Sequence, residues 1–267
     1  MKPIIWKEIR ERKFSLIAYS VATVGLIWMY VSLFPSLQSQ AQNYNKILES
    51  MPKGFMEAFG VSGNWMSNLE SFLSTEMFSM MWPLLAIFLV VSRAGGALAG
   101  EIDKTTIGTL LAQPISRTRL FIAKYSSGII ALAVYIACSI LLTIPLAKIY
   151  SIAVMPKNYF TLSLLCLLFG GAIFSFAIFI SAISSERSRV YGIIGGILVL
   201  MYATNIISGL KPSLRWIHNF SIFHFFNAPG ALIHNHLDWF ACLVLITSIV
   251  VFSLLGLAFF NKRDIAI

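Results

Sequence analysis

The sequence predicts an all-α membrane protein with six transmembrane helices. Of its 267 residues, 58% are apolar and only 12% are charged, and the mean hydropathy is +0.80. Soluble domains carry roughly 25% charged residues, so a soluble class is excluded. Two further observations support this fold class: a series of long uncharged stretches, and an uneven distribution of Lys and Arg between the loops that join them.

The uncharged stretches have the length that a membrane span needs. A hydrocarbon core about 30 Å thick requires roughly 20 apolar residues of helix. We expect spans at residues 15–34, 77–92, 125–147, 158–185, 190–210 and 239–261. The second is short unless it extends back through Glu76 to residue 72. Helices are expected because an open strand would leave backbone groups unpaired in lipid.

The basic residues predict the orientation. Of the 20 Lys and Arg residues, 14 fall on the side that holds the termini and six on the other side. The positive-inside rule therefore predicts that both termini are cytoplasmic. Because these residues are scattered at span ends, the net charge of +9 indicates contact with an anionic lipid surface rather than with nucleic acid.

The N-terminal segment, residues 2–14, has the pattern of an amphipathic interfacial helix. Ile5 and Ile9 lie one helical turn apart beside Trp6, and charged residues fill the other positions. We expect Trp6, Lys7 and Arg10 to anchor this segment at the membrane interface. An ordinary basic flank of the first span is the alternative.

The start of the second span contains the candidate substrate path, formed by Glu76, Met77 and Met80. An ionisable group in a span is a functional candidate because its burial is costly. Two simpler interpretations remain: Glu76 faces water at the start of its helix, and the methionines fill packing gaps.

The loop at residues 93–124 separates the second and third spans and is both charged and amphipathic. Asp103 is a candidate helix cap, Ile107, Leu110 and Leu111 share one helical face, and Pro114 ends the helix. A short helix with an apolar edge predicts a docking element. Arg117 and Lys124 are expected to anchor the loop at the inner interface.

Two further patterns concern the packing of helices and the loop on the side of the membrane opposite the termini. The pairs Gly96/Gly100 and Gly192/Gly196 have the spacing that allows close helix packing. The loop at residues 211–238 is rich in aromatic residues, which predicts external re-entrant or interfacial helices before the last span. His224, His234, His236 and Asp238 lie in this loop, but their spacing favours polar loop residues over a metal site, and we expect no metal.

Several of these motifs resemble the type-two ABC-transporter permeases. The resemblance rests on Glu101, on the stretch Gly108-Thr109-Leu110-Leu111, on Pro114-Ile115-Ser116-Arg117 and on Lys124, all after the second span, together with Lys7-Glu8 near the N-terminus. It implies one permease domain over residues 1–267, with an N-terminal elbow helix at 2–14, a cytoplasmic coupling helix within 93–124 and external helices within 211–238.

The resemblance also implies a function and partners. The chain is expected to be the membrane subunit of an ATP-driven exporter in a prokaryotic plasma membrane, paired with a second permease copy or a paralogue. The expected contacts with a separate ATPase subunit are Gly100, Glu101, Asp103, Lys104, Ile107, Gly108, Thr109, Leu110, Leu111 and Pro114.

No catalytic role is expected for this chain. Residues 100–105 lack the second glycine and the spacing of a phosphate-binding loop, so ATP and Mg must bind to the partner subunit. The sequence alone leaves two alternatives open. One is an ATP-independent secondary transporter or channel that uses Glu76, and the other is a membrane scaffold that docks a soluble partner.

Overall fold

The computed structural model describes residues 2–39, 66–108, 115–210 and 212–264. These residues form helices and connecting turns, with no strand among them. Six helices in this part of the chain are long and apolar enough to cross a membrane, at Lys13–Gln38, Leu69–Ala97, Arg117–Ile149, Pro156–Ile183, Arg187–Leu210 and Trp239–Lys262. The predicted all-α class with six spans is confirmed.

Two of the spans contain a widened π-helical turn. The second span comprises α5 (Leu69–Leu73), the π segment η1 (Ser74–Met81) and α6 (Trp82–Ala97). The third comprises α9 (Arg117–Ile136), the π segment η2 (Ala137–Leu141) and α10 (Thr143–Ile149). The side chain of Trp82, the residue directly after η1, donates to Ser139 Oγ in η2 at 2.9 Å, so the second and third spans are joined beside their widened turns.

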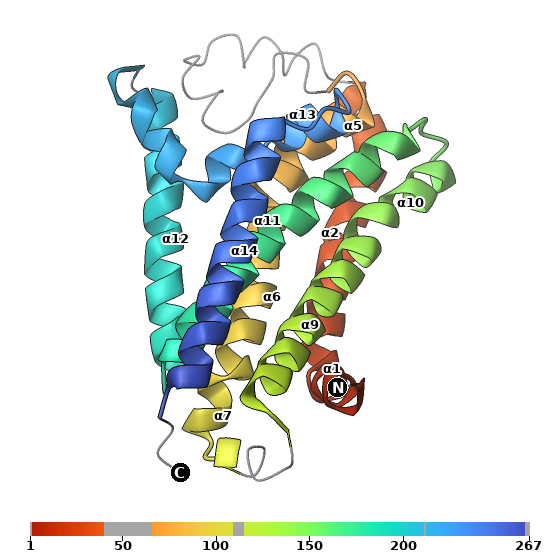
Figure 1. Cartoon of the computed structure of the whole chain (residues 1–267). Coiled ribbons are helices and arrows are strands. Elements are labelled where there is room, and N and C mark those ends of the chain that lie inside the picture. Colours follow the sequence, from red (N-terminus) through yellow and green to blue (C-terminus); the bar gives the residue numbers. More distant parts are fainter. Residues whose placement is uncertain (1, 40–65, 109–114, 211, 265–267) are drawn as a thin grey trace.

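The fourth span, α11 (Pro156–Ile183), lies at the centre of the bundle and crosses it obliquely (Figure 1). Its small residues allow neighbouring side chains to approach closely. Gly128 of α9 does the same from the other side, since a Cβ there would collide with the ring of Phe174 on α11. By contrast, α2 (Lys13–Gln38), α12 (Arg187–Leu210) and α14 (Trp239–Lys262) leave large apolar side chains exposed, as lipid-facing helices do.

One end of the bundle is covered by the segment between the last two spans. It contains η3 (Pro212–Phe220), η4 (Ile222–Phe225) and α13 (Ala228–Leu232), all short. The expected re-entrant or interfacial helices would place their aromatic rings at the depth of the lipid headgroups. Trp216 and Phe220 are exposed, but Phe226 is buried against Phe169, with ring centroids 4.5 Å apart, because the bundle offers an aromatic cluster there.

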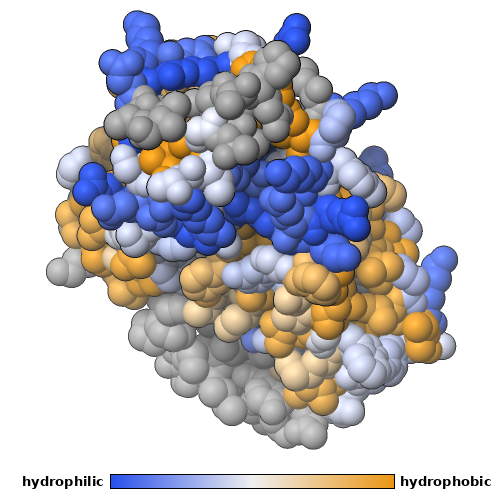
Figure 2. All heavy atoms as spheres, turned by 90° about the horizontal axis from the view of Figure 1, so that it is seen from below, coloured by the Kyte–Doolittle hydropathy of each residue, from blue (hydrophilic) through white to orange (hydrophobic). Residues whose placement is uncertain are grey.

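Both termini lie at the opposite end (Figure 1). There, α1 (Lys2–Glu11) lies across the direction of the bundle and contacts α9, and α7 (Ala99–Asp103) follows α6 after a single residue. Viewed from this end, hydrophilic residues gather in a band across the molecule (Figure 2). The candidate site lies at this end.

Candidate functional site

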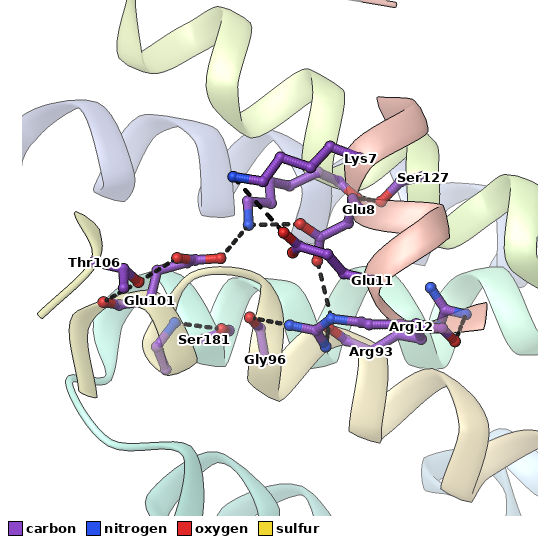
Figure 3. A network of polar contacts seen from close by, with 12 residues as sticks. Lys7, Glu8, Glu11, Arg12, Arg93, Gly96, Glu101, Thr106, Ser127 and Ser181 are labelled. Atoms are coloured by element: carbon purple, nitrogen blue, oxygen red, sulfur yellow. Dashed lines mark hydrogen bonds and ion pairs between the residues drawn. The ribbon is translucent and has the colours of Figure 1, made fainter. Parts of the chain in front are cut away.

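A buried chain of charges joins three elements at the end that carries the termini (Figure 3). The ammonium of Lys124, on α9, donates to Glu8 on α1 and to Glu101 on α7, with both distances 2.7 Å. The side chains are 3%, 7% and 18% exposed respectively. One cation shared by two carboxylates therefore links the N-terminal helix, the segment after the second span and the third span.

Local sequence explains why Lys124 points inward. Ser116 caps α9 by accepting from the backbone N–H of Arg119 at 3.3 Å, which fixes where the helix begins. From there Leu120, Lys124 and Ser127 recur at helical spacing, and all three are buried. Lys124 therefore shares the buried face of α9 and meets its partners inside the protein.

Arg12 extends the network to the end of α6. Its Nε lies 3.1 Å from Glu8 Oε1, and its Nη1 donates to the backbone carbonyls of Ser92 and Arg93, each at 3.3 Å. A further bond runs from Arg12 to the carbonyl of Gly96. Gly96 is one of the last four residues of α6, whose carbonyls have no partner within the helix, and a guanidinium is well suited to donate to such a carbonyl.

Arg93 returns a bond in the other direction. Its Nη2 donates to the backbone carbonyl of Arg12 at 2.9 Å. Arg12 lies between α1 and α2, so the junction of these two helices is attached to the end of α6 by reciprocal bonds. Movement of α6 at this end must therefore displace α1 or break these contacts.

Glu101 stays ionised in this environment. Burial opposes its ionisation, but the hydrogen bond and charge of Lys124, with the hydroxyl of Thr106, outweigh that effect and hold the pKa of Glu101 below its usual range. The turn that brings Thr106 back to Glu101 contains Thr105 with φ of 57°, an uncommon value for a β-branched residue. The backbone therefore adopts a strained turn next to the shared cation.

The structure describes part of the predicted docking segment. Gly100 is buried, Lys104 is exposed, and Ile107 and Gly108 are helical. Asp103 ends α7 instead of capping a later helix, because α7 begins as soon as α6 stops. Ile107 is buried in the core, so it does not contribute to an exposed apolar edge as expected. Thr109, Leu110, Leu111 and Pro114 lie outside the described residues.

The predicted anchors fall into two groups. Trp6, Lys7 and Arg10 are exposed on α1, and Lys7 makes only an exposed pair with Glu11 at 3.7 Å. Arg117 donates to the backbone carbonyl of Arg263, after the last span. Lys124 requires a correction: it was expected at the lipid surface, but it is buried because two carboxylates neutralise it.

The predicted substrate path does not form one face. Met77 is fully buried in the core, while Glu76 and Met80 are partly buried. All three lie in η1, where the turn is wider than in an α-helix, so the separation of three residues between Met77 and Met80 does not place them on one face. The buried position of Met77 corrects the expectation that it lines a path.

One of the two predicted glycine pairs, Gly96/Gly100, has a different use from the expected one. A Cβ on Gly96 would collide with the guanidinium of Arg12, and one on Gly100 would lie 3.0 Å from Arg187 Nε. Gly192 and Gly196 have open space around them among the described residues. Gly96 and Gly100 therefore make room for arginine side chains rather than for a second helix backbone.

Sequence reasoning missed Glu8, Arg12 and Arg93 as site residues. A signal for Glu8 was present: it lies three residues after Ile5 and four after Ile4, on the apolar face of the N-terminal helix. An acid on an apolar face needs a buried partner. The i,i+4 spacing of Glu8 and Arg12 was a local signal for that pair, but no local pattern identifies the contacts between Arg12 and Arg93, because each donates to a backbone carbonyl 81 positions away.

Comparison with known families supports a transport role for this architecture. The sequence model of the family described as "ABC-2 family transporter protein" matches residues 3–265, which is nearly the whole chain. A search of curated proteins found no match.

Proposed function

The chain belongs to the ABC-2 family of transporter proteins, and from this premise we propose that it is the membrane subunit of an ATP-driven exporter whose motor is a separate ATPase subunit. The chain is a multi-pass membrane permease of an ABC transporter, and membership of this family implies association with an ABC ATPase. The proposal adds export across a prokaryotic plasma membrane, cytoplasmic termini, and pairing with a second copy or a paralogue. ATP and Mg²⁺ bind to the ATPase subunit in this scheme.

The observation that carries the proposal is the shared cation at Lys124. A motor that acts on the segment after the second span needs a stiff connection to the rest of the bundle. Glu101 lies at the start of that segment, and its bond to Lys124 leads directly to the third span and, through Glu8, to the N-terminal helix. Because all three side chains are largely buried, water does not readily replace these bonds.

The mechanism that follows is a rigid-body shift. When the ATPase closes on nucleotide, it displaces residues 100–114. The bundle has two states, and each state of the ATPase makes better contacts with one of them, so closure shifts the equilibrium between the two. The displacement reaches α9 and α1 through Lys124, and α6 through Arg12. The spans then change the access of substrate to a path between two permease subunits.

Two kinds of variant test the proposal. The chain is co-purified with its ATPase subunit as wild type, as the double variant Leu110→Asp/Leu111→Asp and as Glu101→Gln. We expect the double variant to lose the complex, because two carboxylates replace the proposed apolar contact. We expect Glu101→Gln to keep the complex but to weaken the effect of the permease on the ATPase rate.

The matched control is Lys157→Gln, an exposed charge change at the other end of the bundle. It should leave both the complex and the ATPase rate unchanged. Normal assembly and normal ATPase rates in both test variants would refute the proposed route of coupling. Flux driven by an ion gradient in liposomes that contain only this chain would instead support a secondary transporter.

A further inference from the structure

A cavity of about 680 Å³ opens beside the charge network, at the end that carries the termini. Six cationic side chains and three carboxylates line it. The carboxylates already have partners, since Lys124 and Arg12 neutralise Glu8 and Glu101, and Lys7 pairs with Glu11. The remaining cations are Arg93, Lys104 and Arg187, and none of these makes an ion pair within the described ranges.

Arg93 is the most constrained of these cations. The residue is only 5% exposed, and one of its nitrogens donates to Arg12. Its Nε and Nη1 are buried and have no acceptor among the residues that the structure describes. A buried donor without an acceptor is unfavourable, and the penalty is larger for a charged group. The cavity therefore contains a guanidinium that lacks a counter-ion.

A second guanidinium from another helix completes the cavity. Arg187, the first residue of α12, also has a buried Nε with no acceptor in the described part of the chain. Gly100 leaves the space that this side chain occupies, because a Cβ there would lie 3.0 Å from both Nε and Nη2 of Arg187. Arg93 and Arg187 thus line one cavity from two different spans.

We propose that this cavity is an anion site that binds a phosphate group, presented by an anionic phospholipid headgroup or by free phosphate. Guanidinium groups match phosphate oxygens in geometry and form strong charge-assisted bonds with them. The cavity lies where α6 ends and α12 begins, next to the amphipathic helix α1, whose pattern is typical of helices at a membrane interface. Its volume accommodates a headgroup as well as a free phosphate.

The inference does not rest on the proposed coupling function, although the cavity adjoins the charge network, and the ligand would act as a bridge. Arg93 belongs to the second span and Arg187 to the fifth, so one phosphate held by both ties α12 to the charge network. The expected consequence is a more stable chain in the presence of the anion. Stability and retention of the ligand can be measured without the ATPase subunit.

The test uses the full-length chain purified in detergent. Thermal unfolding is followed with added phosphatidylglycerol, with phosphatidylcholine, and with inorganic phosphate against chloride at equal ionic strength, while native mass spectrometry counts retained lipid. We expect phosphatidylglycerol, but not phosphatidylcholine, to raise the unfolding temperature and to be retained. Stabilisation by inorganic phosphate alone would identify free phosphate as the source of the same chemistry.

Arg187→Gln is the main variant, with Arg189→Gln as its matched control, because Arg189 is exposed two positions away and does not line the cavity. Loss of one charge-assisted contact should weaken phosphate or lipid binding about tenfold in Arg187→Gln and leave it unchanged in Arg189→Gln. Arg93→Gln should abolish binding, and if that variant fails to fold, Arg187→Gln still decides the question. Equal responses to both lipids with none to phosphate, or equal binding by both Arg variants, would overturn the proposal. The proposal would also be overturned if the ATPase subunit stabilised the chain while neither lipid nor phosphate did, since a carboxylate of that protein would then fill the site.

Discussion

Replacement of Lys124 by methionine tests the charge network most directly. Methionine keeps the length of the side chain but removes the cation that Glu8 and Glu101 share. Removing one partner of a buried ion pair costs about 3–5 kcal/mol, because a charge is left without compensation. Here Glu8 keeps Arg12 as a partner at 3.1 Å, and Glu101 keeps Thr106 and is 18% exposed. We therefore expect Lys124→Met to lower the free energy of unfolding by an amount near the lower end of this range, about 3 kcal/mol.

Two companion variants provide reference values for this loss of stability. Glu101→Gln keeps an oxygen that accepts from Lys124, and Lys124 keeps its pair with Glu8. The free energy of unfolding of this variant should therefore fall by no more than about 1.5–3 kcal/mol, the value of a hydrogen bond to a charged group. Lys7→Met removes a cation from the exposed pair with Glu11, in which Lys7 is 64% exposed. Its effect should stay within about 0–1 kcal/mol.

The assay is reversible unfolding of the purified chain in mixed micelles, titrated with a denaturing detergent and followed by far-UV circular dichroism. The expected order of destabilisation is Lys124→Met, then Glu101→Gln, then Lys7→Met. Equal midpoints for Lys124→Met and Lys7→Met would refute the reasoning, because a cation in water and a cation between two buried carboxylates would then be equivalent.

The pH dependence supplies an independent check on Glu101. Its pKa is lowered in the folded chain, so its contribution to stability is present above the ordinary glutamate pKa of about 4.3 and is lost as the pH falls through the lowered value. Glu101→Gln should remove this part of the acid sensitivity. A variant that loses stability in acid as steeply as the wild type would contradict the assignment.

Two further predictions concern the bundle and its other end. Gly128→Ala should destabilise the chain by about 1–3 kcal/mol, since the new methyl group collides with Phe174. Gly192 has open space around it, so Gly192→Ala should be neutral or should stabilise the chain by up to about 1 kcal/mol through its higher helix propensity. The same unfolding titration compares the two variants. His224 has a pKa lowered by burial and by His218, although Asp238 opposes the shift. Its contribution to stability is therefore present above about pH 6.5 and is lost as the pH falls. His224→Gln should make the unfolding temperature less dependent on pH between about pH 7 and pH 5, by a small amount because the side chain is partly exposed.

The spans were predictable because lipid imposes a simple rule on composition. Uncharged length identified all six, and most of the helices extend past the predicted limits, whereas α11 ends at Ile183, two residues before its predicted limit. The third span shows why: Arg117 and Lys124 precede the predicted start at residue 125, yet both belong to the same helix. Charge marks the edge of the hydrocarbon, not the end of a helix.

The site was only partly predictable. The resemblance pointed to Glu101 and Lys124, but not to the bond between them, because a bond between residues 23 positions apart leaves no periodic trace. The different burial of Met77 and Met80 was not predictable for another reason, since both lie in a π segment, which does not have the 3.6 residues per turn of an α-helix. Backbone irregularity of this kind follows from packing and is not visible in residue type.

The bond between Glu8 and Lys124 has a consequence for how the chain is made. The two residues lie 116 positions apart, so at about 5–20 residues per second Glu8 leaves the ribosome about 6 to 23 seconds before its partner. During that interval Arg12, one helical turn away, is the counter-ion within reach. Arg12 can already bond to the end of α6, but the N-terminal helix gains its bond to α9 only after residue 124 has been synthesised, so a chain truncated before residue 124 should expose its N-terminus to protease more than the full chain does.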